Sequence, residues 1–205
     1  MLRAALLAAV LAVPSQAAPV AAPLTFDASI FNALRQIAQL RAASIKTLDA
    51  GLASRLNRLA MDMRRLQQQA AHLREEARRL HPRLIVIPRR PVDPNLAFDV
   101  RRLAQDFSQL ARDMSWKLQD ARSIRSEVRG KDPDLVGPAS YFAGEVLWLS
   151  NETRWLDMEV RSMIWDLRSL GFHFDAMDME RAVRDIEADT AGLKNESDLI
   201  SANIR

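Results

Sequence analysis

The stretch from Phe142 to Leu170 constrains the fold of this chain most strongly, because its apolar residues recur every seven positions. One set comprises Phe142, Leu149, Leu156, Met163 and Leu170, and a second set comprises Val146, Thr153, Val160 and Leu167. Together the two sets give the alternating three- and four-residue spacing of a coiled-coil seam over four heptads. The pattern predicts a long amphipathic helix that packs its seam against other helices.

The same stretch carries two further rows. An acidic row directly precedes the second apolar set and comprises Glu145, Glu152, Glu159 and Asp166. A tryptophan-rich row lies on the flank and back of the helix and comprises Trp148, Trp155, Met158 and Trp165. A surface helix has one apolar stripe, so the second row favours burial of the tryptophans, either under another helix or under the arginine stems of the first helix. The alternative is an exposed strip in which Trp148, Trp155 and Trp165 bind a peptide, a glycan or a membrane surface.

The periodicity of the whole chain predicts an all-α fold. We expect an elongated antiparallel bundle of about four long helices with coiled-coil-like heptad packing, at about residues 27–80, 95–129, 138–170 and 175–204. The first helix is the longest. It either continues through Gly51 or breaks there, since glycine costs about 1 kcal/mol in a helix relative to alanine.

Prolines and capping residues set the predicted helix ends. Four prolines between residues 82 and 94 predict a Pro-rich loop, in which Leu84–Ile87 is extended and covers the bundle core or binds a partner. Asp93 followed by Pro94 predicts a capped helix start. Gly171 is expected to close the helix over 138–170, and Asp175 to open the last helix.

The first 17 residues have the pattern of a secretory signal peptide. Arg3 precedes the apolar run of residues 4–13, and small residues lie before the expected cleavage after Ala17. Residues 18–26 are then a disordered lead-in, and residues 27–205 a single helical-bundle domain with no transmembrane segment. The chain has no cysteine, which excludes disulfides and thiolate metal sites. Arginine outnumbers lysine 25 to 4, which we interpret as a GC-rich bacterial genome and hence a periplasmic or secreted protein.

The charge is distributed unevenly along the chain. Residues 18–130 hold 20 basic and 11 acidic side chains, whereas residues 131–205 hold 8 basic and 15 acidic ones. Pairing between the two halves is the favoured interpretation. The alternative is an envelope-polymer site on the basic face of residues 55–102. Its candidate binding residues are Arg58, Arg65, Arg79, Arg89 and Arg90.

Residues that carry chemistry are few. His72, His81 and His173 are scattered, and a di-metal bundle needs paired Glu-x-x-His elements with further inward carboxylates. Carboxylates seven positions apart on a helix are roughly 10.5 Å apart, too far for an acid–base pair. No glycine-rich phosphate loop is present. The sequence therefore predicts neither catalytic residues nor a metal or cofactor.

These observations predict a non-enzymatic exported protein that acts as an interaction or scaffold module in the bacterial envelope. Its partner is a protein, or a second copy of itself held through helices. The first alternative is a chaperone-like or anionic-polymer-binding periplasmic protein, and nucleic acid is not an expected partner. An enzyme or metal carrier with a site assembled across helices ranks last.

Overall fold

The computed structural model describes residues 28–85, 93–128, 130 and 132–204. The chain divides into two compact units, Met1–Ala42 and Ala43–Arg205. The helices are α1 (Ala28–Ile85), α2 (Pro94–Glu127), α3 (Pro133–Ser169) and α4 (His173–Ile204). No strand occurs among the described residues, so the all-helical prediction is confirmed. The signal peptide and lead-in predicted at residues 1–26 lie outside the described residues.

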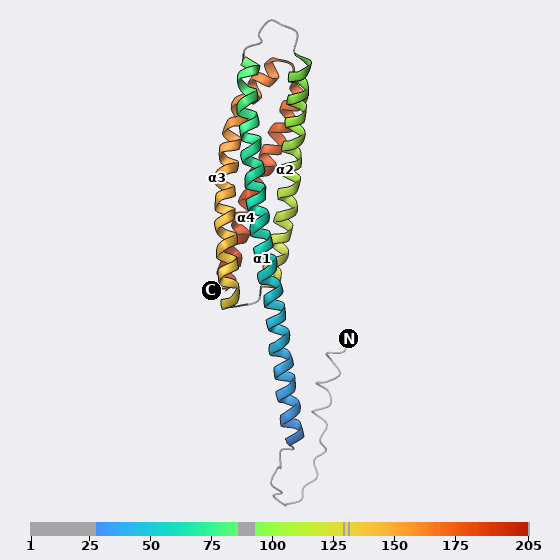
Figure 1. Cartoon of the computed structure of the whole chain (residues 1–205), viewed down its shortest axis with the longest axis vertical. Helices are drawn as coiled ribbons and strands as arrows, with labels where there is room; N and C mark the ends of the chain where they lie inside the picture. Colours follow the sequence, from blue (N-terminus) through green and yellow to red (C-terminus); the bar gives the residue numbers. More distant parts are fainter. Residues whose placement is uncertain (1–27, 86–92, 129, 131, 205) are drawn as a thin grey trace, which may run out of the picture. The chain divides into compact units, whose positions relative to one another are not determined.

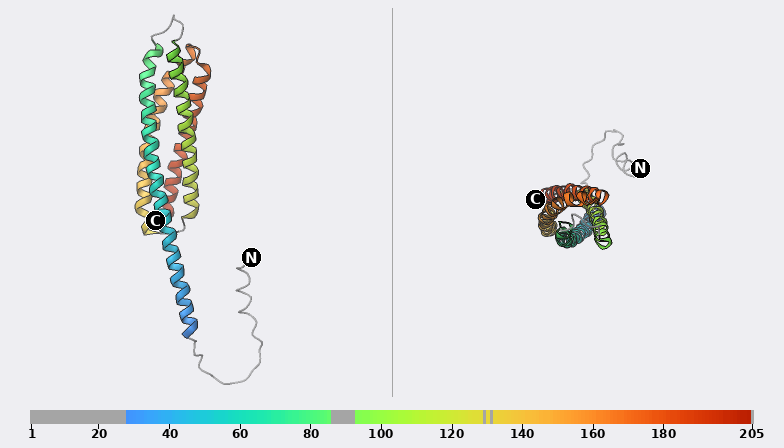
Figure 2. Two further views of the ribbon diagram at one scale, coloured as in Figure 1. Left: turned by 45° about the vertical axis from the view of Figure 1, so that its right-hand side comes forward. Right: turned by 90° about the horizontal axis from the view of Figure 1, so that it is seen from above.

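Within the second unit the helices form a bundle (Figure 1). Helix α4 packs against both α2 and α3. Ion pairs join α1 to α2 through Arg55 and Glu127, and α1 to α3 through Arg74 and Glu152. Viewed from the end, the helices therefore follow one another around a ring in the order α1, α2, α4, α3 (Figure 2). Successive helices run in opposite directions (Figure 1).

The predicted seam of α3 lies in the hydrophobic core of this unit. In α3, the buried seam residues are Phe142, Val146, Leu149, Thr153, Leu156, Val160, Met163 and Leu167. Helix α1 contributes Leu56, Met63 and Ala70 to the same core, each fully buried. Burial of one such leucine or methionine side chain contributes roughly 1.5–3 kcal/mol. A continuous apolar core along the bundle axis follows, and it stabilises helices that would be marginal alone.

Helix α1 continues without a break through Gly51. It also continues through Pro82 to Ile85, so the loop predicted to start at Pro82 begins later, and Leu84 and Ile85 are helical rather than extended. Proline removes one backbone hydrogen bond, but the extra turn buries Leu84 to 3% exposure. Val86 and Ile87, predicted to be extended, lie outside the described residues.

Capping explains where α2 and α3 begin. The Asp93 carboxylate accepts from the backbone N–H of Asn95 at 3.0 Å, as the Asp93-Pro94 pair predicts. Asp132 caps α3 in the same way, so α3 starts at Pro133 and not at residue 138. Helix α4 starts at His173, two residues before the predicted Asp175.

The C-terminal end of α3 is a Schellman motif built on Gly171. The backbone N–H of Phe172 donates to the carbonyl of Leu167 at 2.9 Å, and that of Gly171 donates to the carbonyl of Arg168 at 3.1 Å. Gly171 has a φ of +90°, a conformation that suits glycine. The predicted end of this helix is confirmed, and the motif turns Phe172 onto the core.

Candidate interaction surface

The outward face of α3 carries a continuous row of exposed residues, which we call the α3 strip. Its members are Tyr141, Gly144, Trp148, Asn151, Trp155, Met158, Ser162 and Trp165, all exposed. The three tryptophans are 62%, 57% and 74% exposed. Leu147, next to the strip, is also exposed. Large aromatic side chains gathered on one exposed face mark an interaction surface more often than an ordinary solvated one.

Burial of the tryptophans, the interpretation favoured from sequence, is wrong for this chain. Each helix of the ring has two neighbours, and for α3 these are α1 and α4. The seam centred on Leu156 faces the core, while the adjacent positions on both sides contact the neighbours. The remaining face is directed away from the bundle, and it carries Trp155.

One flank of the α3 strip is acidic and lies against α1. Arg74 of α1 pairs with Glu152 at 3.0 Å, and its neighbour one turn on, Arg78, lies 3.6 Å from Glu159. The Nε2 of His81 lies 2.9 Å from a carboxylate oxygen of Asp166. Glu152, Glu159 and Asp166 of the acidic row therefore pair with residues of α1.

The other flank is basic and lies against α4. Arg161 donates to the buried carboxylate of Asp157 at 2.5 Å and reaches Glu187 of α4 at 3.2 Å. The hydrogen bond to Asp157, followed by the charges of Asp157 and Glu187, raises the pKa of Arg161 above its ordinary value. Arg168 pairs with Glu180 at 2.5 Å. An arginine row thus borders the strip opposite the acidic row, and exposed Arg154 begins it.

The basic residues predicted as binding residues do not join this surface. Arg58 and Arg65 are exposed on α1, and Arg65 lines a groove of about 410 Å³ with Asp106 and Asp113 of α2. Arg79 donates to Glu75 one turn earlier on its own helix at 3.2 Å. Arg89 and Arg90 lie outside the described residues. The structure therefore places Arg58, Arg65 and Arg79 on α1, apart from the aromatic strip on α3.

Much of the basic face of residues 55–102 is neutralised by carboxylates of the next helix. Arg55 donates to Glu127 of α2 at 2.6 Å, and Arg83 pairs with Asp99 at 2.6 Å. The hydrogen bond from Arg55 lowers the pKa of Glu127. Arg74 and Arg78 of α1 likewise pair with carboxylates of α3. Together these contacts support pairing within one molecule more than binding of an anionic polymer.

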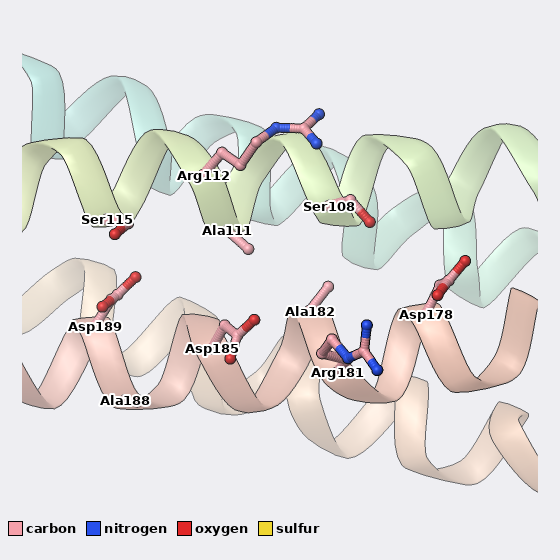
Figure 3. Close-up of a pocket in the computed structure, with 10 residues that line it drawn as sticks. All are labelled: Ser108, Ala111, Arg112, Ser115, Asp178, Arg181, Ala182, Asp185, Ala188 and Asp189. Carbon is pink, nitrogen blue, oxygen red and sulfur yellow. The ribbon is translucent and has the colours of Figure 1, made fainter.

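A groove between α2 and α4 was not anticipated from the sequence. It measures about 530 Å³ and is lined by Asp178, Asp185 and Asp189 of α4 and by Arg112 of α2 (Figure 3). Burial, and next the charge of Asp185, raise the pKa of Asp189. The sequence feature that could have indicated the groove is a set of small residues on the two helices, namely Ser108, Ala111, Ser115, Ala182 and Ala188. They leave room where larger side chains would fill the interface.

The histidines remain separate in the structure. His72 lies 3.6 Å from Glu76, not from Glu75, and His81 pairs with Asp166. Within the described parts of the chain, no three His, Asp or Glu side chains converge in a way that would hold a metal ion. None of the helices described here is long and apolar enough to cross a membrane.

Comparisons with protein-family models, with curated proteins and with solved structures find no match to this chain.

Proposed function

We propose that this protein is a non-enzymatic interaction module whose bundle presents the α3 strip to a protein partner. The observation that carries the proposal is the exposure of Trp148, Trp155 and Trp165 along one face of one helix. Tryptophan, tyrosine and arginine dominate the binding energy of protein interfaces. Here three tryptophans lie between rows of charged residues, the arrangement of an apolar interface centre with a polar rim.

The bundle gives this surface a rigid support. The alternating three- and four-residue spacing of the buried seams supports knobs-into-holes packing in an elongated antiparallel bundle. Ion pairs on both sides of α3 hold the helix in a fixed rotation, through Arg74 and Glu152 on one side and Arg168 and Glu180 on the other. A side chain on a rigid helix loses less conformational entropy on binding than one on a loop.

The place of action that we propose is the bacterial envelope. The proposal rests on the pattern of residues 1–17, with cleavage after Ala17. Intact-mass measurement on protein from the native host tests it. A mature chain that begins at Ala18 is expected, and a chain that retains residues 1–17 would contradict export.

Site-specific photo-crosslinking tests the interaction surface. A photoreactive residue at position 155 is expected to give adducts in the native host, and one at position 116 on α2 is the matched control, because Trp116 is also exposed at 66%. Adducts at 155 should persist from about 50 to 300 mM salt, since apolar docking is not screened. Equal adducts from both positions, or none from 155, would contradict the proposal.

The dependence on salt concentration distinguishes apolar docking from binding of an anionic polymer. Binding through arginines on the basic face of residues 55–102 would weaken steeply over this salt range, because it depends on charge. Loss of the position-155 adducts at the higher salt concentration would show that binding there depends on charge, and it would contradict apolar docking through the strip.

A further inference from the structure

The α3 strip has the spacing of a second coiled-coil seam. From Tyr141 to Trp165, successive residues of the strip are three and four positions apart in turn. The residues of the buried seam on the opposite face have the same spacing. In heptad notation, Tyr141, Trp148, Trp155 and Ser162 occupy position a. Gly144, Asn151, Met158 and Trp165 occupy position d. One helix thus carries one seam for its own bundle and another directed outward.

The residues that flank this second seam are charged with opposite signs. The e positions, directly after each d residue, are Glu145, Glu152, Glu159 and Asp166. The g positions, directly before the a residues, include Arg154 and Arg161, and Arg168 continues the row. Charges at e and g decide partner choice and orientation in coiled coils.

This charge pattern distinguishes between two orientations of a second α3 helix. In a parallel pair, a g residue meets the e residue five positions further along the other helix. Arg154 then faces Glu159 of the other copy, and Arg161 faces its Asp166. In an antiparallel pair g meets g and e meets e, which would place arginines against arginines and carboxylates against carboxylates. The pattern is therefore complementary to itself only in the parallel orientation.

The carboxylates on the acidic flank keep a part of their surface exposed, 21% for Glu159 and 20% for Asp166. Arg154 is exposed, and the pair of Glu159 with Arg78 is loose, at 3.6 Å. A carboxylate has about four lone-pair directions and can accept a second donor. The intramolecular pairs therefore need not break when a second copy binds.

The neighbouring helices reinforce this orientation. Residues 43–85 of α1 hold 9 basic and 4 acidic side chains, while α4 holds 3 basic and 8 acidic ones. Because α1 and α4 lie on opposite sides of α3, a parallel copy brings α1 toward the α4 helix of the other molecule. The net charges, +5 and −5, then attract each other. An antiparallel copy would bring α1 toward α1 and α4 toward α4.

The sizes of the strip residues fit such a pair of helices. In a parallel pair, equivalent positions form layers, so a layer of two Trp148 side chains lies between layers of Gly144 and Asn151. Small layers next to large ones let aromatic rings spread over them. The three tryptophans expose roughly 300–500 Å² together, given about 150–250 Å² for a whole aromatic side chain. That is a substantial part of the roughly 800 Å² per partner in a standard interface.

We propose that the occupant of the α3 strip is a second copy of this chain, joined in a parallel two-fold dimer through α3. This inference rests on the proposed function and names its partner. Sedimentation equilibrium of the purified protein should then give twice the protomer mass at micromolar concentration. Trp155→Glu should raise the dissociation constant of the dimer at least tenfold. Trp116→Glu, the matched exposed control, should leave it unchanged.

Cysteine crosslinking tests the orientation, since the chain has no cysteine of its own. Ser162→Cys places equivalent thiols in one layer of a parallel dimer, so mild oxidation should give a disulfide-linked dimer. Ser126→Cys, exposed on α2, should remain monomeric under the same conditions. In an antiparallel pair, residue 162 would instead face residue 144. Crosslinking of a Gly144→Cys and Ser162→Cys mixture without crosslinking of Ser162→Cys alone would overturn the parallel assignment.

The outcomes separate this inference from the proposed function. A monomer at all concentrations, together with position-155 photo-adducts to another protein, would overturn the dimer and leave the interaction surface standing. A monomer without any such adducts would overturn both. A dimer that forms equally well with Trp155→Glu would place the interface elsewhere and overturn the dimer proposed here.

Discussion

Arg125 of α2 lies 2.9 Å from the carboxylate of Glu196 in α4, whose side chain is only 6% exposed. Arg122, one turn earlier, lies 3.7 Å from the same carboxylate. A buried carboxylate is costly unless cations compensate it, so these two arginines make Glu196 tolerable at the α2–α4 interface. The contact links the basic half of the chain to its acidic half.

Removal of the closer arginine is therefore expected to destabilise the protein. Arg125→Ala should lower the free energy of unfolding by about 1–3 kcal/mol, because Glu196 keeps only the more distant Arg122. Arg101→Ala, at an exposed position on the same helix, should change it by less than about 0.5 kcal/mol. Urea unfolding of both variants measures the difference, and equal midpoints would contradict the structural role of this pair.

Truncation of two adjacent residues of α3 is expected to destabilise the protein to very different extents. Leu156 is 1% exposed and Trp155 is 57% exposed. Leu156→Ala should cost about 2–5 kcal/mol through the cavity it leaves. Trp155→Ala should cost less than about 1 kcal/mol at concentrations low enough to keep the protein monomeric. Thermal melts compare the two, and a larger loss for Trp155→Ala would show that the helix is rotated differently.

The pair between Arg55 and Glu127 should make stability depend on pH. The hydrogen bond from Arg55 lowers the pKa of Glu127 below its ordinary value of 4.5. Its contribution is therefore complete above the unfolded pKa and is lost as pH falls through the lower folded pKa. At pH 7, Glu127→Gln should lower the free energy of unfolding by less than about 1 kcal/mol relative to the parent protein, since the pair is partly exposed.

As pH falls through the lowered folded pKa of Glu127, the free energies of unfolding of the parent protein and of Glu127→Gln should converge, because the native carboxyl then loses its charge. A difference that stays constant from pH 7 to pH 3 would contradict this assignment.

The ionised carboxylate of Asp189 is expected to destabilise the fold, whereas that of Glu127 stabilises it. Burial, and then the charge of Asp185, raise its pKa above 3.8, so the ionised carboxylate destabilises the fold at neutral pH. Asp189→Asn should stabilise the protein at pH 7 by up to about 1 kcal/mol, after allowance for solvent screening. The gain should disappear as pH falls below the unfolded pKa of Asp189, because its carboxyl is then protonated in both the folded and the unfolded protein. Asp198→Asn, at an exposed position of α4, is the control, and an equal gain there would contradict the explanation.

The seams could be predicted from sequence because burial imposes a period on them. Leu149 and Leu156 follow that period and are buried. The helix ends were less predictable, because proline has two roles. Pro133 and Pro94 begin helices behind capping aspartates, whereas Pro82 lies inside the last turns of α1. Only the packing of Leu84 shows that the helix continues there.

The candidate surface could be located from sequence but its exposure could not. Trp148 and Trp155 recur with the same heptad period as the core residues, and periodicity records a face of a helix without recording what covers it. The number of neighbours around α3 decides burial, and that number depends on how the other helices arrange themselves. The α2–α4 groove was missed for a related reason, since Ala111 and Ala182 became neighbours only on folding.

Acrylamide quenching of tryptophan fluorescence tests the central claim, that the α3 strip faces solvent in the protomer, most directly. The measurement uses a Trp116→Phe background, so that only Trp148, Trp155 and Trp165 report. At nanomolar concentration the emission should be red-shifted and readily quenched, as for exposed indole. Blue-shifted emission that resists quenching at this concentration would show that the protomer buries these rings itself, and it would contradict the account.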